Sequence, residues 1–185
     1  MKIALINGSP RQKNSSEVIE YIKTNFGEQK FETFNLGKIS MNYCIDCGGC
    51  KDGKCIAHKD ELNDALLKIA NCDGVVMISP VYFGGMTAQL KTLIDRTRPL
   101  RRNGFMLKNK VGAAISLGGS RNGGQEIVVS QIHAAMHINA MIIVGDNAHF
   151  GGRVHSPFSS DEIGKKTVHG TIEKVIETIN LIKKI

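Results

Sequence analysis

Four of the five cysteines in this 185-residue sequence are crowded into one short segment, YCIDCGGCKDGKC. Cys44, Cys47, Cys50 and Cys55 lie within twelve residues. Two residues between consecutive cysteines let their sulfur atoms turn toward one centre, as in the loops that hold iron–sulfur clusters. The glycines among them let the backbone wrap closely around such a centre. The spacing therefore indicates a redox or metal centre held by thiolates.

Three kinds of site fit these four thiols. The sequence contains no second cysteine set, so Cys55 would close a single [4Fe–4S] cluster with the other three. Structural zinc is the rival, although zinc usually takes two Cys-x2-Cys pairs separated by a longer stretch. His58 could add a zinc ligand, but a lone histidine in a loop is more often solvated. Uncoordinated reactive thiols are the third alternative. Cys72, before a buried strand, is expected to be an inert packed thiol.

Alternating strands and helices must position this cysteine segment. Apolar strands are expected at 2–7, 30–36, 73–79, 111–117 and 140–145, and helices at 16–25, 59–70, 88–97, 124–138 and 162–184. Nearly continuous apolar strands are typical of a parallel sheet that is buried on both faces. The pattern predicts an α/β, flavodoxin-like doubly wound five-stranded parallel sheet of order 2-1-3-4-5. A cysteine-rich loop, about 43–58, is inserted after the second strand, and residues 1–185 are expected to form one domain.

Three polar loops follow strands of this sheet and should meet at one edge, because the carboxyl ends of parallel strands lie together. The first loop, NGSPRQKNSSE, has neither a Walker lysine nor the dinucleotide glycine pattern. Its hydroxyls and the helix N-terminus behind it suit an anion, unless it is an ordinary capping turn. Asn14 is expected to cap that helix together with Glu17. The candidate contacts are Ser9, Arg11, Asn14, Ser15 and Ser16.

The second and third loops, SPVYFGGMTAQLK and SLGGSRNGGQE, could hold a flat ring system. The second offers aromatic surface on a bend at two glycines, unless its rings fold back into the core. The glycines of the third let the backbone approach a ligand, so that its amides could bond the polar edge of the ring. The candidate contacts are Pro80, Val81, Tyr82, Phe83 and Gly84 in the second loop, and Ser116, Gly118, Gly119, Arg121, Gly123 and Gly124 in the third.

These loops resemble the flavin-contacting loops of the NADPH-dependent FMN reductase family. With the cysteines added, nearly the whole chain resembles the iron–sulfur flavoproteins of anaerobic archaea and bacteria, whose signature is a compact Cys-x2-Cys-x2-Cys-x4–7-Cys. The resemblance implies FMN on the loop residues and a [4Fe–4S] cluster on the four cysteines. FMN is favoured over FAD because no second phosphate-binding loop is evident. The resemblance also implies an oxidoreductase that assembles as a homodimer or homotetramer, with the cluster of one subunit near the flavin of another.

By the same resemblance, reduced ferredoxin would supply electrons to the cluster, which would reduce FMN. The terminal acceptor stays open: oxygen or peroxide, a quinone, or another protein. One alternative is an NAD(P)H-dependent FMN or quinone reductase whose cysteine loop holds zinc or only stiffens the structure. The other is a non-enzymatic flavodoxin-like electron carrier. We assign no catalytic acid, base or nucleophile, because the cofactors would carry the chemistry.

Charge and hydropathy limit which partners and which location in the cell are expected for the protein. The net charge is +7, and basic residues gather at 96–110, in a solvated loop or a docking surface for an acidic ferredoxin. With no tryptophan and no recognition motif, nucleic-acid binding is not expected. No apolar run approaches the roughly 20 residues that span a bilayer, and no signal peptide is evident, so a cytoplasmic protein away from membranes is expected. A long loop at 145–160 would cover the flavin or build a subunit interface.

Overall fold

The computed structural model describes residues 1–11 and 13–184 of the chain. Its central sheet contains β1 (Lys2–Asn7), β2 (Lys30–Asn35), β5 (Gly74–Pro80), β6 (Val111–Gly118), β7 (Ile142–Ile143) and β8 (Gly152–His155). The strand order is β2-β1-β5-β6-β7, with β8 also paired to β6, and every pairing in this sheet is parallel. The predicted order 2-1-3-4-5 is therefore confirmed for a doubly wound sheet.

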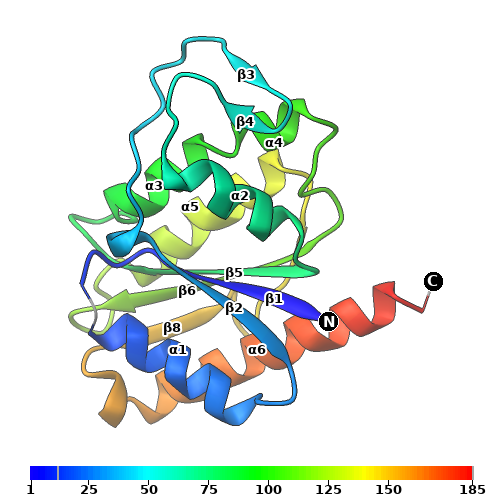
Figure 1. The fold of residues 1–185 in the computed structure, drawn as a ribbon. Coiled ribbons are helices and arrows are strands. Elements are labelled where there is room, and N and C mark those ends of the chain that lie inside the picture. The colour runs from blue at the N-terminus through cyan, green and yellow to red at the C-terminus, as the bar shows by residue number, and fades with distance from the viewer. Residues whose placement is uncertain (12, 185) are drawn as a thin grey trace.

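Helices cover both faces of the sheet (Figure 1). One layer contains α1 (Asn14–Asn25) and α6 (Glu162–Ile182), and the other contains α2 (Glu61–Ala70), α3 (Ala88–Asp95) and α5 (Gln125–Ile138). Alternate residues of one strand enter opposite layers: Ile3 and Leu5 pack on the α1–α6 side, Ala4 and Ile6 on the other. Burial on both faces explains why the strands are nearly continuous apolar runs. Among the helices of the described residues, none is long and apolar enough to cross a bilayer.

The fifth strand differs from the prediction. A single strand over 140–145 was wrong, because β7 keeps only two residues and the chain pairs with β6 again as β8. Between them the Asp146 carboxylate accepts hydrogen bonds from the backbone N–H groups of Ala148 and His149. This side-chain turn competes with strand pairing. The expected loop at 145–160 therefore contains β8 and a short 3-10 helix, η2 (Phe158–Ser160), within its length.

The cysteine segment, residues 43–58, stands above α2 and α4 (Arg98–Arg102), away from the sheet (Figure 1). It follows the 3-10 helix η1 (Leu36–Lys38) and contains a two-stranded hairpin, β3 (Cys50–Lys51) and β4 (Lys54–Cys55). Asp52 and Gly53 connect these strands, both with positive φ (48° and 74°). An Asp-Gly pair with that backbone is a type I′ turn, whose twist matches a hairpin. The turn places Cys50 directly opposite Cys55.

A buried ion pair joins the cysteine segment to the helical layer beneath it. The Arg96 and Asp60 side chains are 1% and 5% exposed, and two hydrogen bonds of 2.9 Å link the guanidinium to the carboxylate. Arg96 also donates to the Asn42 carbonyl at 2.7 Å and to Asn63 Oδ1 at 3.2 Å. Asn63 in turn bonds the backbone N–H and carbonyl of Cys55, both at 3.1 Å. One guanidinium therefore connects both ends of the cysteine segment to α2 and to the end of α3.

Two further arginines fasten the same segment. Arg98 forms an ion pair with Asp46, and Arg102 donates to the Gly48 carbonyl at 3.0 Å. Residues 98–102 form the helix α4 and 103–110 are a mostly exposed loop, so the prediction of a solvated loop over 96–110 was wrong only for its first part. The physical reason is local: Thr97 precedes a proline near the helix start, where proline favours helix, and the arginines find intramolecular acceptors. Two of the basic residues of α4 therefore contact the cysteine segment.

The Asp60 carboxylate is held in its ionised form. Burial opposes ionisation, but hydrogen bonds from Arg96 and from the Asn42 backbone N–H outweigh it and lower the pKa of Asp60 from its ordinary 3.8 to about 2. A carboxylate whose folded-state pKa is depressed stabilises the fold fully above its unfolded pKa. That contribution is lost as pH falls through the folded-state value.

Asp60→Asn should lower the free energy of unfolding by about 3–5 kcal/mol at pH 7, because it leaves the Arg96 charge buried without its carboxylate. Urea denaturation at several pH values should show the difference in free energy of unfolding between parent and variant decreasing between about pH 4 and pH 2, because the parent carboxylate takes up its proton there. Asp64→Asn is the control: its side chain is 76% exposed, and its loss should change stability by less than about 0.5 kcal/mol. A difference in free energy of unfolding that stays constant with pH would contradict the lowered pKa of Asp60.

Candidate functional site

The three predicted loops meet at one edge of the sheet, on the left in Figure 1. Hydrogen bonds tie them together: the Gly8 N–H donates to the Ile78 carbonyl at 2.7 Å, and the Val81 N–H donates to the Leu117 carbonyl at 2.8 Å. Thr87, at the start of α3, donates its hydroxyl to the Gly8 carbonyl at 2.6 Å. The residues expected to act together are thus brought to one place, at the switch point between β1 and β5.

The first loop is built around its own polar side chains. The Ser9 N–H donates to Asn7 Oδ1 at 3.0 Å, and Ser9 Oγ accepts from the Arg11 N–H at 3.1 Å. The prediction that Asn14 caps α1 was wrong, because Lys13 occupies the cap position and Asn14 is already helical. Asn14 Nδ2 instead donates to Ser156 Oγ at 2.9 Å. Ser156 follows β8 and was missed in the sequence, since only the split edge strand brings it here.

Two buried hydroxyls at this edge lack partners. Within residues 1–11 and 13–184, Ser15 Oγ and Ser116 Oγ have no hydrogen bond, although Ser15 is 3% exposed and Ser116 is fully buried. Buried hydroxyls are normally paired, so each orphan calls for an explanation. Ser15 lies in the first turn of α1, where free N–H groups and the helix dipole favour an anion. A phosphate group fits this position.

The second loop presents an exposed aromatic ring. Tyr82 and Gly85 exchange hydrogen bonds of 2.8 and 3.0 Å around Phe83 and Gly84, which both have positive φ (47° and 79°). For phenylalanine this backbone is strained by roughly 1–3 kcal/mol, and such strain gathers at ligand-binding sites. The Phe83 side chain is fully exposed, so it does not fold back into the core. The Arg11 guanidinium lies 5.9 Å from the centre of the Tyr82 ring, which joins the first loop to the second.

The third loop is tightly packed where it leaves β6, and its backbone is accessible one residue later. Gln125 Nε2 donates to the Ser120 carbonyl at 2.7 Å, and a Cβ at Gly118 would lie 2.2 Å from the same nitrogen. Glycine is therefore required at Gly118 by close packing. At Gly119 a Cβ would have open space around it, so the peptide there is accessible to a ligand. Arg121 is exposed beside it, and Gly123 and Gly124 lead into α5.

The four clustered cysteines surround one cavity. Cys44, Cys47, Cys50 and Cys55 line it together with residues from the end of α3 and the start of α4. All five cysteines of the chain are free thiols, and Cys72 is buried apart from the others. His58 lines the same cavity, and its Nε2 atom is buried without a partner among the described residues. His58 as a whole is half-buried, so only this one nitrogen is shielded from solvent.

The thiols oppose one another electrostatically. Burial raises the pKa of Cys50, Arg98 and Arg102 act in the other direction, and the neighbouring Cys55 and Cys44 raise it further. The thiolate is the form of cysteine that ligates a metal, and a bound cationic centre would favour that form. In the part of the chain that the structure describes, no three cysteine, histidine or acidic side chains stand close enough to hold a single ion. By its chemistry, a set of four thiolate donors is one that holds an iron–sulfur cluster.

Both sites contact the same short helix. The second loop leads into α3 at Thr87, and Asp95 and Arg96, at the other end of α3, line the cysteine cavity. A helix of eight residues spans about 12 Å. Within one protomer the candidate flavin edge and the cysteine cavity therefore lie at opposite ends of α3.

Comparison with known proteins identifies the family of the chain. The family model described as NADPH-dependent FMN reductase matches residues 1–154. An iron–sulfur flavoprotein from Methanosarcina thermophila is 43% identical, over all of this chain and 98% of that protein.

Solved structures share the fold at low identity. RosB, with a bound formylriboflavin phosphate, has a TM-score of 0.78 at 13% identity, over 100% of this chain and 81% of RosB. A flavodoxin from the domain Archaea has a TM-score of 0.61 at 14% identity, over 96% of this chain and 99% of the flavodoxin. The fold is thus flavodoxin-like, and the family makes the protein an FMN-dependent oxidoreductase. The chain belongs to the iron–sulfur flavoproteins of the NADPH-dependent FMN reductase family.

Proposed function

We propose that the protein passes electrons between a [4Fe–4S] cluster on Cys44, Cys47, Cys50 and Cys55 and an FMN at the edge of the sheet. One observation carries the proposal: all four free thiols line a single cavity. That cavity lies at the C-terminal end of α3, the helix that follows the second loop. A flavin exchanges one or two electrons and a cluster exchanges one, so together they can divide or combine electron pairs.

The sheet edge offers separate places for the two parts of FMN. The N-terminal turn of α1, with the unpartnered Ser15 hydroxyl and the nearby Arg11, suits the phosphate. The exposed turn at Phe83 and the open backbone at Gly119 suit the ring, the first by aromatic contact and the second by backbone hydrogen bonds. One anion-binding loop rather than two supports FMN over FAD.

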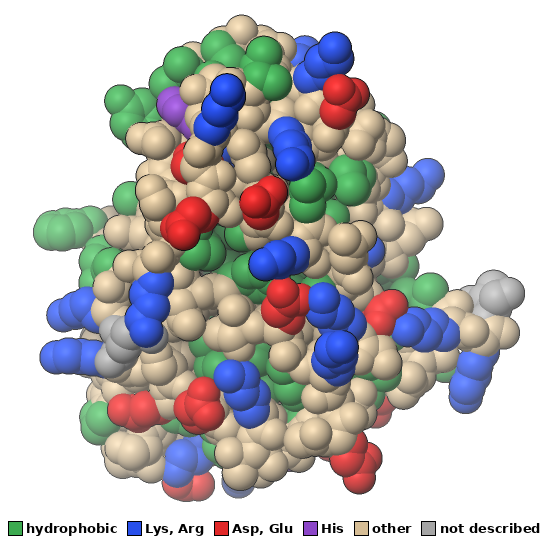
Figure 2. Space-filling model, viewed as in Figure 1, with side chains coloured by type: hydrophobic (Ala, Val, Ile, Leu, Met, Phe, Trp, Pro, Cys, Tyr) green, Lys and Arg blue, Asp and Glu red, His purple; other side chains and the backbone are tan. Residues whose placement is uncertain are grey.

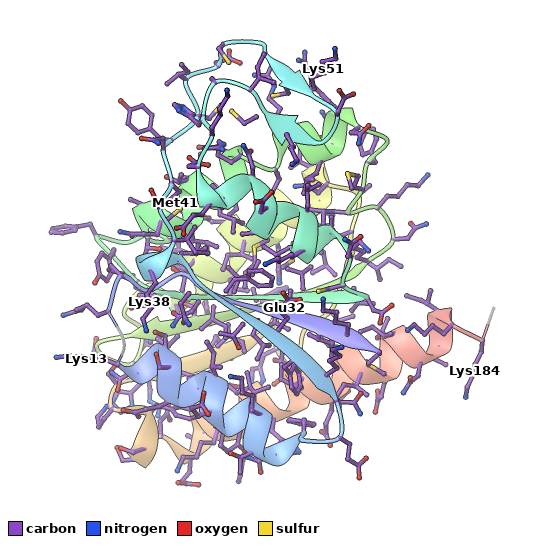
Figure 3. The ribbon with its side chains drawn as sticks, in the orientation of Figure 1. Lys13, Glu32, Lys38, Met41, Lys51 and Lys184 are labelled. Carbon is purple, nitrogen blue, oxygen red and sulfur yellow. The ribbon has the colours of Figure 1, made fainter. Side chains whose placement is uncertain are left out.

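The donor in this proposal is a reduced, acidic ferredoxin-like protein. Lys51 lies on the hairpin at the far end of the molecule from the sheet and points outward (Figure 3). Figure 2 shows Lys and Arg side chains beside the hydrophobic ones, a class that includes cysteine, at the same end. Positive charge there would steer an acidic partner toward the cluster. The acceptor would be oxygen, peroxide, a quinone or another protein.

The proposal also includes association of the protein with copies of itself. Tyr43, Ile45 and Ile56 on the cysteine segment are 73%, 56% and 59% exposed, and Phe83 on the second loop is fully exposed. Exposed apolar groups at both sites support a homodimer or homotetramer in which the cluster of one subunit approaches the flavin of another. Such contact would shorten the electron path set by α3.

A second function has one observation in its favour. The unpartnered His58 Nε2 lies in the lining of the cysteine cavity, and cysteine with histidine is a common zinc donor set. The protein would then be an NAD(P)H-dependent FMN or quinone reductase with a structural metal. Iron, sulfide and zinc analysis separates the two functions.

Cys50→Ser should remove most of the iron and sulfide from protein purified without oxygen, because a cluster of this type needs four thiolate ligands. The control is Cys72→Ala, which lies outside the cavity and should keep both at the parent level. Zinc without iron in the parent protein would contradict the cluster and favour the reductase.

Ser15→Ala should weaken FMN binding by about 10- to 100-fold, because a hydrogen bond to a charged group is lost. Quenching of flavin fluorescence on titration measures the affinity. The stability of the flavin-free protein should not fall, since the Ser15 hydroxyl has no partner in the described residues. Ser159→Ala, at an exposed position, is the control. Equal affinities for the two variants would place the phosphate elsewhere.

Lys51→Glu should slow ferredoxin-linked flavin reduction several-fold at low salt, and the difference from the parent should vanish at high salt as charges are screened. Stopped-flow absorbance at several ionic strengths measures both. Lys184→Glu reverses a charge near the C-terminus, far from the hairpin (Figure 3), and should leave the rate unchanged. The same rate for parent and Lys51→Glu at low salt would remove the docking proposal.

Phe83→Asp should shift the protein toward smaller species in sedimentation velocity, because it places a charge in the proposed subunit contact. Leu181→Asp, at a position 61% exposed near the end of α6, should leave the sedimentation coefficient unchanged. A parent protein that is already monomeric would end the proposal of a shared electron path.

A further inference from the structure

Arg96 is a fully buried arginine with one unused donor. Its side chain is 1% exposed, yet its Nε atom has no hydrogen-bond partner anywhere in residues 1–11 and 13–184. Its other nitrogens are occupied: Nη1 by Asn42 and Asp60, and Nη2 by Asp60 and Asn63. Leaving a buried N–H unpaired costs about 1–3 kcal/mol, and more when the group is charged. A partner for this N–H is therefore expected.

The cavity of the four cysteines is where that partner would lie. Arg96 is part of its lining, together with all four thiols. Because a guanidinium is planar and rigid, the contacts at Nη1 and Nη2 also fix the direction of the Nε–H bond. His58 Nε2 is the other unpartnered nitrogen in the lining, but histidine donates there only in one tautomer or when protonated. Arginine always carries the proton, so Arg96 is the dependable donor.

We propose that Arg96 donates its Nε–H to a sulfur atom of the centre that the four cysteines hold, and thereby raises the reduction potential of that centre. The inference rests on the proposed cluster. A reduced cluster carries one more negative charge than an oxidised one, so a hydrogen bond to sulfur favours the reduced state. The donor acts locally, since the Asp60 carboxylate offsets the full charge of the guanidinium.

A matched pair of variants isolates the donor from the charge. Both carry Asp60→Asn, so that no carboxylate is left buried without its cation. One adds Arg96→Gln, whose amide nitrogen occupies the place of Nε along the side chain and keeps an N–H there. The other adds Arg96→Met, which has a similar apolar stem and no donor. EPR-monitored redox titration of the anaerobically purified proteins gives the reduction potential of each cluster.

The Met variant should have the lower potential. Loss of one hydrogen bond to a charged sulfur should change the reduction equilibrium about tenfold, which is about 59 mV for a one-electron couple. Glu20→Gln combined with Lys23→Gln or with Lys23→Met is the control pair, because this exposed ion pair lies on α1 and outside the lining of the cysteine cavity. The two control proteins should have equal potentials.

The outcomes separate this inference from the proposed function. A parent protein without iron ends the cluster and the inference together. A parent with iron, but equal potentials for the Gln and Met variants at Arg96, overturns the inference alone.

A measurement on the unaltered protein covers the case in which the variants do not fold. Pulsed EPR of the reduced cluster in protein labelled with 15N at arginine Nε should show a coupled arginine nitrogen. The absence of that coupling would equally overturn the proposal.

Discussion

The ion pair between Arg96 and Asp60 is the interaction on which the position of the cysteine segment depends. A segment of this length, whose regular structure is one short two-stranded hairpin, cannot bury enough apolar surface to fix its own place. The pair supplies that place by bonding both ends of the segment to α2 and α3. A buried pair of this kind is weak evidence for net stability, since desolvation offsets much of the attraction. Its role here is to specify one geometry for four thiols.

The sheet depends on a different constraint, which is burial of its strands on both faces. This burial forces strands of near-continuous apolar sequence and leaves polar chemistry to the loops at their ends. The parallel pairings of β5 with β1 and with β6 bring the ends of these three strands together, so the loops that follow must meet. The flavin edge is thus a consequence of topology. Its strained turn at Phe83 and its unpartnered hydroxyls are tolerated because the rigid sheet holds them.

How much the sequence predicts follows from the range of each interaction. Cysteine spacing and strand periodicity are local patterns, so the cysteine segment, the first four strands and the three loops could be located directly in the sequence. Arg96 looked like one member of a basic run, because its partners Asp60 and Asn42 are 36 and 54 residues away. Asn14 was misjudged for the same reason, because its side chain bonds Ser156, which is 142 residues away. The split of the fifth strand depends on one carboxylate at Asp146 that closes a turn, which strand propensity does not register.

Helix α3 has a consequence for how the protein matures. It begins where the second loop ends and finishes at the lining of the cysteine cavity, and it is about two turns long. A segment so short orders as one cooperative unit, so occupancy at either end stabilises the same hydrogen bonds. Under the proposed function, binding of the metal centre and binding of the flavin would then be thermodynamically linked, and each would assist the other by the same factor. Comparing flavin affinity in iron-loaded and iron-free protein would measure that factor.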